Sequence, residues 1–280
     1  MRVHDRSRQR FPLRAVLCLL LLLFAGPGLA AQLNFQVLYQ GIFSAGSKLQ
    51  IADLSLSERR PAAAPYHESE LRVTSQAYDY VEALYPIRYR FRSWYLDDHS
   101  TGLVSEYFEQ NRREGIRHRL IYLTDPEQPF VTRDLVEEGE ADLPDLLAGD
   151  YRFVLSDSHE ARFDRLGLLA HVRAQALAPG TFLQAKVSNG KKMLTYRVRV
   201  EKREQIQAAG RNWNALKLRF DGLGVDKHGR EKHAHRPVFI WLSDDPQHTP
   251  LRAVSRHVLG RFSIELRSID QTPRLVMRGL

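Results

Sequence analysis

The clearest pattern in the chain is an alternation of apolar and polar residues. In the most regular segment, Ile87, Tyr89, Phe91, Ser93 and Tyr95 alternate with Arg88, Arg90, Arg92 and Trp94. Successive side chains of a β-strand point to opposite faces, so this pattern predicts a strand with one buried and one solvated face. Residues 194–201, 216–220 and 262–267 repeat the pattern.

Weaker alternation predicts further strands at residues 33–38, 48–56, 70–77, 103–108, 117–123, 181–187, 237–242 and 251–258. Turn residues separate the predicted strands, and Asn189-Gly190 is the strongest of them because a type I′ hairpin turn needs positive φ at both positions. Weaker turn signals are Thr101-Gly102, Glu114-Gly115, Ala209-Gly210 and Gly260. Many short strands predict an all-β fold, in which a curved antiparallel meander sheet forms an open or closed barrel.

One short helix is expected among these strands. Asp164 is a suitable N-cap, the helix runs to about residue 177, and Pro179-Gly180 ends it. The acidic stretch 137–150 is the one shift in composition. We interpret it as a connection within a single β-rich domain spanning residues 31–280.

The first thirty residues have the layout of a secretory signal peptide. Five arginines precede an apolar run that Gly26-Pro27-Gly28 interrupts, and the small residues Ala30 and Ala31 follow. The apolar run is shorter than the roughly 20 residues that a membrane-spanning helix needs. Cleavage is expected after Ala30, with a periplasmic mature protein and no transmembrane segment.

Removal of this segment changes the composition of the mature chain. The single cysteine, Cys18, is lost, which excludes disulfides, thiolate metal sites and a cysteine nucleophile. The segment also carries about half of the net charge of +8. The remaining charges are interspersed, so nucleic-acid binding is not expected, and no cofactor is indicated.

Three histidines in one segment are the weak candidates for metal ligands. His228, His233 and His235 lie within residues 227–236, beside Asp226 and Glu231. Imidazoles at this spacing can bind zinc if a turn brings them together. The flanking glycines favour a solvated hairpin loop instead, so we predict no metal site.

Two other polar clusters raise the alternative of a hydrolase. Asp97-Asp98-His99 places carboxylates beside an imidazole, a combination suited to general acid–base catalysis. Ser243-Asp244 would need His248 or His257 as a general base. Both motifs also have the composition of turns, and the chain has no Gly-x-Ser-x-Gly motif, so no catalytic residue is assigned.

The aromatic strand faces are the candidate ligand-binding surface. If the sheet encloses a cavity, Tyr89, Phe91, Tyr95, Tyr196 and Val198 are expected to point inward, because they occupy the apolar faces of the two best-patterned strands. Arg88, Arg90 and Arg92 would then lie outside, or at a rim where an anionic headgroup binds.

Several short motifs are similar to those of a known family. They are Tyr39-Gln40-Gly41-Ile42 with Ala45-Gly46, Leu84-Tyr85-Pro86, the segment 95–107 with Asp98, Asp164 before Leu166-Gly167-Leu168-Leu169 with Arg173 and Gly180, Gly190-Lys191-Lys192 before 196–204, Trp241-Leu242-Ser243-Asp244-Asp245 with Pro250, and 260–266. Over residues 35–270 the chain thereby resembles the bacterial exported proteins classed as domain of unknown function 3108 (DUF3108). The resemblance implies an exported, typically periplasmic β-rich domain. It assigns no catalytic or binding residue, and the segment 222–236 departs from the usual spacing.

Three functions remain open at this stage. The first is a non-enzymatic binding or envelope-maintenance protein whose partner is a lipid or another apolar or amphipathic envelope molecule. The second is a hydrolase that uses Asp97, Asp98 and His99 or the Ser243-Asp244 region. The third is a scaffold that docks another envelope protein through a sheet edge.

Overall fold

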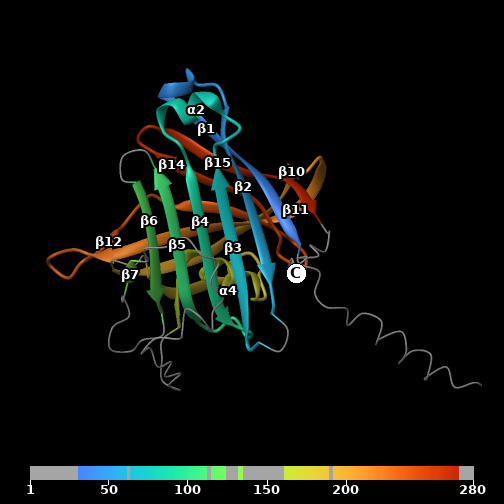
Figure 1. The fold of residues 1–280 in the computed structure, drawn as a ribbon. Coiled ribbons are helices and arrows are strands. Elements are labelled where there is room, and N and C mark those ends of the chain that lie inside the picture. Colours follow the sequence, from blue (N-terminus) through green and yellow to red (C-terminus); the bar gives the residue numbers. More distant parts are fainter. Residues whose placement is uncertain are drawn as a thin grey trace, which may run out of the picture.

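The computed structural model describes residues 31–61, 64–111, 115–123, 132–134, 161–188 and 192–270. These residues form one 15-stranded sheet, with the strand order β7-β6-β5-β4-β3-β2-β1-β15-β14-β13-β11-β10-β9-β8 and with β12 paired to β11 (Figure 1). The strands are β1 (Gln32–Gly41), β2 (Leu49–Arg59), β3 (Tyr66–Thr74), β4 (Arg88–Leu96), β5 (Gly102–Asn111), β6 (Gly115–Tyr122), β7 (Thr132–Asp134), β8 (Arg162–Phe163), β9 (Phe182–Ser188), β10 (Met193–Ala208), β11 (Arg211–Val225), β12 (Glu231–His233), β13 (Val238–Ser243), β14 (Pro250–His257) and β15 (Gly260–Asp270).

The sheet is a meander whose two halves meet at its first and last strands. β1 pairs with β2 on one side and with β15 on the other, both antiparallel. Among the described strands only the β8–β9 pair is parallel. The strongly alternating segments all lie within strands, and the weaker predicted segments do as well, with bounds that shift by a few residues.

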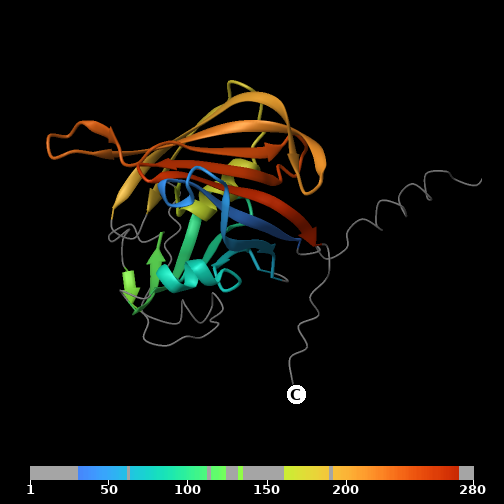
Figure 2. The same cartoon turned by 90° about the horizontal axis from the view of Figure 1, so that it is seen from above.

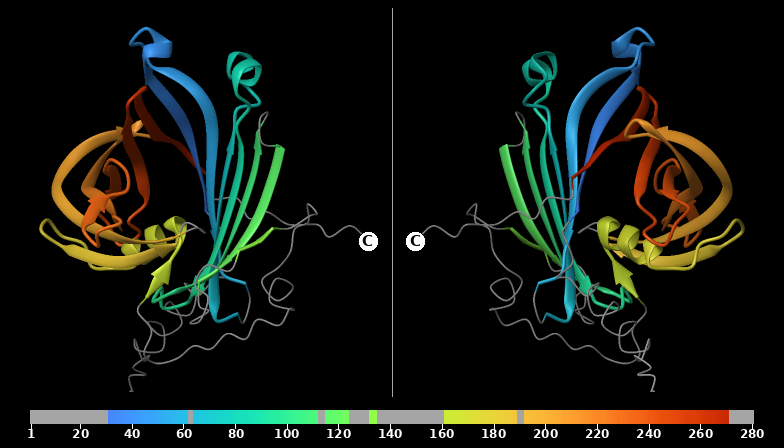
Figure 3. Two further views of the ribbon diagram at one scale, coloured as in Figure 1. Left: turned by 90° about the vertical axis from the view of Figure 1, so that its left-hand side faces the viewer. Right: turned by 90° about the vertical axis from the view of Figure 1, so that its right-hand side faces the viewer.

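The half of the sheet that contains β9 to β15 curls over itself, whereas β3 to β7 form a flatter wing (Figures 2 and 3). At the end of the curl, β8 comes back to the wing, where the backbone N–H of Arg162 donates to Thr101 Oγ1 at 3.3 Å. The terminal strands β7 and β8 are not paired with each other. The prediction of an all-β fold with a curved antiparallel sheet is therefore confirmed, and the barrel is open.

The helix α4 (Arg165–Arg173) lies where the curl meets the wing (Figure 3). Asp164 is its N-cap, as predicted, because its carboxylate accepts from the backbone N–H groups of Leu166 and Gly167. The helix is shorter than expected and ends before Pro179. The six-residue α2 (Asp79–Leu84) and the 3-10 turn η1 (Ile42–Ser44) were not predicted. No helix among the described residues has the length and apolar character needed to cross a membrane.

Apolar side chains of α4 and of the curled strands form the larger core cluster. It includes Phe163, Leu168, Tyr196, Val198 and Leu216, all nearly inaccessible to solvent. A second cluster lies around the β1–β15 junction and includes Phe35, Leu54, Trp241 and Leu266. Burial of these side chains is the main stabilising contribution to a fold without disulfides.

Some predictions concern residues outside the described ranges. The signal peptide at 1–30, the acidic stretch 137–150 and the Asn189-Gly190 turn all lie there. The strands on either side of Asn189-Gly190 do pair, with Ser188 opposite Met193. The turn signal at Ala209-Gly210 is confirmed, because both residues have positive φ between β10 and β11.

Candidate functional site

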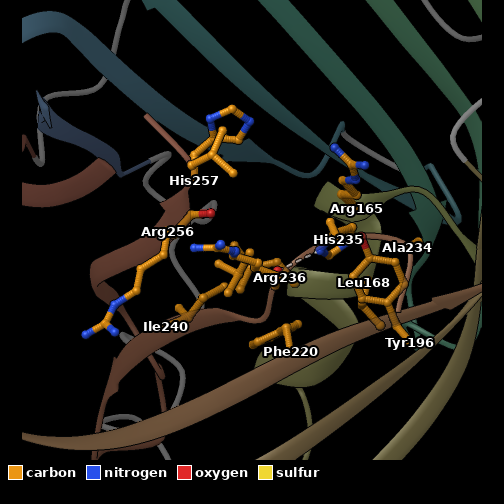
Figure 4. Close-up of a pocket in the computed structure, with 14 residues that line it drawn as sticks. Arg165, Leu168, Tyr196, Phe220, Ala234, His235, Arg236, Ile240, Arg256 and His257 are labelled. Atoms are coloured by element: carbon orange, nitrogen blue, oxygen red, sulfur yellow. Dashed lines mark hydrogen bonds between the residues drawn. The ribbon is translucent and has the colours of Figure 1, made fainter. Parts of the chain in front are cut away.

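A pocket of about 570 Å³ lies between α4 and the inner face of the curled sheet (Figure 4). Its volume falls within the range of roughly 300–1,000 Å³ that is typical of small-molecule sites. Residues from α4, β10, β11, β13, β14, the loop before β13 and the β14–β15 turn line it: Arg165, Leu168, Leu169, Tyr196, Phe220, Ala234, His235, Arg236, Val238, Ile240, Ser255, Arg256, His257 and Val258.

The wall of the pocket is apolar because of the alternation along β10 and β11. On β10, Tyr196 and Val198 are buried while the intervening Arg197 is half-buried and Arg199 is exposed. Phe220 on β11 is also buried and packs in the same cluster. Tyr196 and Val198 are both buried in the core cluster of the curled strands, and Tyr196 lines the pocket.

Three arginines are among the residues that line the pocket. Arg165 begins α4, Arg236 lies in the loop before β13, and Arg256 lies on β14. All three are exposed, and none forms an ion pair within the described part of the chain. The lining residues that the structure describes include no aspartate or glutamate. The pocket therefore combines an apolar interior with positive charge, which favours an anionic ligand.

His235 is held in the pocket by several contacts. Its Nε2 lies 2.8 Å from the Tyr196 hydroxyl and its Nδ1 lies 2.8 Å from the backbone oxygen of Arg236. Gly222 makes room for the ring, since a Cβ at that position would approach Nε2 to 2.5 Å. The backbone N–H of Ala234 also donates to the oxygen of Gly222 at 2.8 Å. The loop that carries Arg236 is thus fastened to the sheet.

A second hollow, of about 410 Å³, contains three of the residues predicted to bind a ligand, Arg88, Tyr89 and Arg90. Its arginines already have acidic partners. Arg88 forms a double hydrogen bond to Glu82, and Arg90 lies 3.6 Å from Glu106 and over the ring of Phe108. Burial raises the pKa of Tyr89. This hollow is the weaker anion site because its charges are compensated.

Arg92 does not lie outside or at a rim, contrary to expectation. It is 3% exposed, pairs with the fully buried Glu106 and lies over the ring of Trp94. Burial opposes ionisation of Glu106, yet Arg92, His118 and Arg90 together lower its pKa. Alternation indicated a polar face on β4, but a polar face is not necessarily a solvated one, because charged groups that neutralise one another can be buried.

The remaining predicted aromatic residues of β4 lie on the face that meets α4. Tyr95 is buried, and its hydroxyl is 2.9 Å from that of Ser69. Phe91 packs against Tyr107 with 4.7 Å between ring centroids. Neither residue lines the pocket of Figure 4. Tyr95 belongs to the contact between the curl and the wing.

The three candidate metal-binding histidines are not brought together. His228 lies in a turn in which its backbone N–H donates to Asp226 Oδ1, whereas His233 Nδ1 lies 3.7 Å from Asp221. His235 points into the pocket, as described above. Within the described residues, no group of three histidine, cysteine or acidic side chains has the geometry to hold a metal ion.

Asp97, Asp98 and His99 form a turn after β4. Asp98 Oδ1 accepts from the backbone N–H of Ser100 at 2.9 Å, and His99 has a φ of 56°. Asp97 pairs with Arg60 and His67. Burial lowers the pKa of His99, and the neighbouring His67 lowers it further. The backbone oxygen of His99 contacts His171 of α4 at 2.6 Å, so this turn helps to join the wing to the curl.

Ser243 and Asp244 also have structural partners. The Ser243 hydroxyl donates to Asp245 Oδ1 at 2.8 Å and accepts from the backbone N–H of Thr249 at 2.7 Å. His248 Nδ1 lies 3.1 Å from the backbone oxygen of Ser243, and Asp244 pairs with Arg203. No imidazole lies beside this hydroxyl among the described contacts, so the motif is a turn that joins β13 to β14.

Sequence reasoning missed Arg165, Arg236 and Arg256 as site residues. Each is a single arginine in a different element, and no local motif connects them. The apolar alternation around Tyr196 was a local signal of the pocket, and His235 was singled out only as a candidate metal ligand.

Comparison with solved structures concerns the fold of the chain. A crystal structure of a beta-barrel-like protein of domain of unknown function DUF1849 from Brucella abortus is similar, with 9% identity and a TM-score of 0.52, over 86% of this chain and 97% of that one. At this identity the similarity concerns the fold alone.

A putative exported protein with a YmcC-like fold from Bacteroides fragilis matches with 7% identity and a TM-score of 0.30, over 86% of this chain and 95% of that one. That score is too low to establish a common fold. No curated protein matches the chain.

The family comparison concerns the part of the chain that builds the pocket. The match covers residues 154–267, a narrower range than the resemblance suggested, and leaves out the motifs before Asp164. It includes α4 and the strands β9 to β14. Residues 154–267 match the family described as "Protein of unknown function (DUF3108)", which confirms the resemblance to that family.

Proposed function

We propose that this protein is an exported, non-enzymatic binding protein that holds an anionic amphipathic molecule of the cell envelope. The observation that carries the proposal is the pocket of about 570 Å³, in which an apolar wall is combined with Arg165 and Arg236, two exposed arginines that form no ion pair within the described part of the chain. The N-terminal segment 1–30, with the layout of a signal peptide, supports export.

The two parts of the pocket suit the two parts of such a ligand. Leu168, Phe220 and Ile240 offer an apolar surface for an acyl chain. Transfer of each methylene from water contributes about 0.8 kcal/mol, which is enough for micromolar binding of a long chain after the costs of association. Arg165 and Arg236 supply donors for a carboxylate or phosphate.

The geometry is less favourable to the two alternative functions, a hydrolase and a scaffold that docks another envelope protein. The acidic and histidine residues considered for a hydrolase are engaged in turns, as described above. The terminal strands β7 and β8 of the described sheet have only three and two residues, so these two strands themselves offer a short template for a docking partner.

Reversal of charge at the pocket tests the proposal. The double variant Arg165→Glu, Arg236→Glu is expected to bind a fluorescent fatty acid at least about tenfold more weakly, equivalent to ~1.4 kcal/mol. Binding of the corresponding uncharged fatty alcohol should change much less. Arg199→Glu is the matched control, because Arg199 is exposed on β10 outside the described pocket.

Filling of the pocket provides an independent test of the apolar part. Ser255 is half-buried and lines the pocket, so Ser255→Trp introduces a large ring without removing a core side chain. This variant should retain the wild-type circular dichroism spectrum and lose binding of both probes. Wild-type protein that binds neither probe would contradict the proposed function, as would a Ser255→Trp variant that binds both normally.

A further inference from the structure

Four exposed apolar side chains form a tip at one end of the molecule. Ile42 and Phe43 in η1 are 67% and 74% exposed, and Val258 and Leu259 in the β14–β15 turn are 75% and 40% exposed. Isolated exposed apolar residues are common, but a cluster drawn from two separate loops is typical of an interaction surface. We name these four residues the apolar tip.

The two loops of the apolar tip are fixed to each other. The backbone N–H of Ile42 donates to the oxygen of Leu259 at 3.3 Å, and the Tyr39 hydroxyl donates to the same oxygen at 2.7 Å. Gly41 and Gly260 face each other in the β1–β15 ladder. A Cβ on Gly260 would lie 2.5 Å from the oxygen of Gln40, so glycine allows the two strands to approach closely here. The tip is therefore a preformed surface.

Positive charge lies directly behind the apolar tip. Arg256 and Arg261 are opposite each other in the β14–β15 ladder, and both are exposed with no ion pair in the described part of the chain. The acidic residue Glu265 farther along β15 is already near Lys48 and Arg252. Like charges opposite each other in a sheet repel, and an anionic surface would relieve that repulsion.

The apolar tip is continuous with the pocket. Arg256, His257 and Val258 line the pocket, and the turn that follows them forms part of the tip. In Figure 4 the side chain of Arg256 extends away from the other lining residues. A surface bound to the tip would therefore lie beside the pocket.

We infer that the apolar tip, together with Arg256 and Arg261, docks the protein on an anionic lipid surface. The apolar side chains would enter the boundary between headgroups and acyl chains, and the two arginines would contact anionic headgroups. Docking at this position brings the pocket to the membrane for uptake or release of its ligand. The role of the pocket rests on the proposed function, whereas docking itself can be measured separately.

Vesicle flotation tests the inference. Wild-type protein, from Ala31 onward, should float with vesicles of phosphatidylglycerol and phosphatidylcholine and much less with vesicles of phosphatidylcholine alone. Two double variants are compared with the wild type. The variant Phe43→Ser with Val258→Ser removes the apolar part of the contact, and the variant Arg256→Glu with Arg261→Glu reverses its charge. Each double variant should bind the anionic vesicles at least roughly tenfold more weakly. All four side chains are exposed, so we expect these variants to fold.

Controls separate this inference from the proposed function. Val225→Ser removes an equally exposed apolar residue at the end of β11 and should leave vesicle binding unchanged. The double variant of Arg165 and Arg236 should lose the fatty-acid probe yet still float. The inference is overturned if the tip variants float as well as the wild type. It is also overturned if the wild type does not bind vesicles but forms a concentration-dependent dimer in analytical sedimentation that the tip variants abolish.

Discussion

Asp164 combines a local and a long-range role in one side chain. Its carboxylate accepts from the backbone N–H groups of Leu166 and Gly167 at 2.6 and 2.8 Å, so it begins α4. It is also buried, and the helix packs so closely on β4 that a Cβ on Gly167 would lie 3.1 Å from Ser93 Oγ. Burial raises the pKa of Asp164, although hydrogen bonds from the two backbone N–H groups oppose this.

Asp164→Ala is expected to lower the free energy of unfolding by about 1–2 kcal/mol through loss of the cap. Asp164→Asn keeps an oxygen that can accept the capping hydrogen bonds, and it replaces the ionisable carboxyl group with a neutral amide. Because the folded pKa is raised, the wild type holds this proton more tightly when folded. The contribution of the protonated Asp164 carboxyl to stability is complete below the pKa that Asp164 has in the unfolded chain. This contribution is lost as the pH rises through the pKa of Asp164 in the folded protein.

Urea unfolding from pH 4 to pH 8 measures this difference. The wild type should lose stability relative to Asp164→Asn as the pH rises. If the two proteins show the same dependence on pH, the raised pKa of Asp164 is wrong.

At the scale of elements, the β10–β11 hairpin depends on its turn. Ala209 and Gly210 have φ values of 49° and 73°, the combination that a two-residue type I′ turn requires. No atom lies within 4 Å of the position that a Cβ on Gly210 would take. A substitution at Gly210 is therefore disfavoured by the positive φ of the backbone and not by a steric clash.

Gly210→Val is expected to destabilise the protein by about 1–2 kcal/mol, because a β-branched residue is strained at positive φ. Gly210→Asn should be far milder, since asparagine tolerates this region. Chemical denaturation of both variants measures the effect. Equal midpoints for Gly210→Val and the wild type would show that the hairpin does not need this turn conformation.

Long elements could be predicted from the local sequence, and short ones could not. Long strands such as β4 and β10 were recognisable because the two faces of each strand differ in residue type over eight or more positions. The short elements β7, β8, β12 and α2 were not found, since two to six residues are too few to display a period. The helix α4 ended earlier than its predicted stop, because the apolar pattern continues through Leu177 into the core outside the helix.

At the scale of the whole molecule, β1 is central to the sheet. It begins at Gln32 and pairs with both β2 and β15, so it joins the two halves. Removal of β1 would leave β2 and β15 without the strand that lies between them. The predicted cleavage after Ala30 stops just short of this strand.

Mass spectrometry of protein recovered from the periplasmic fraction is therefore expected to give a chain that begins at Ala31. A variant with arginine in place of Leu21, in the apolar run, should remain in the cytoplasm with residues 1–30 attached. A mature chain that retains this segment, or one that lacks part of β1, would contradict the prediction.

Local sequence by itself determined the longer strands, the cap of α4, the apolar face of β10 and the resemblance to DUF3108. These features depend on neighbours along the chain, through alternation, capping and turn conformation. The tertiary structure alone decided that Arg92 is buried, because alternation separates two faces of a strand and does not say which is covered. It also decided the candidate site. Arg165, Arg236 and Arg256 come from three separate elements, and only the curl of the sheet brings them to one pocket.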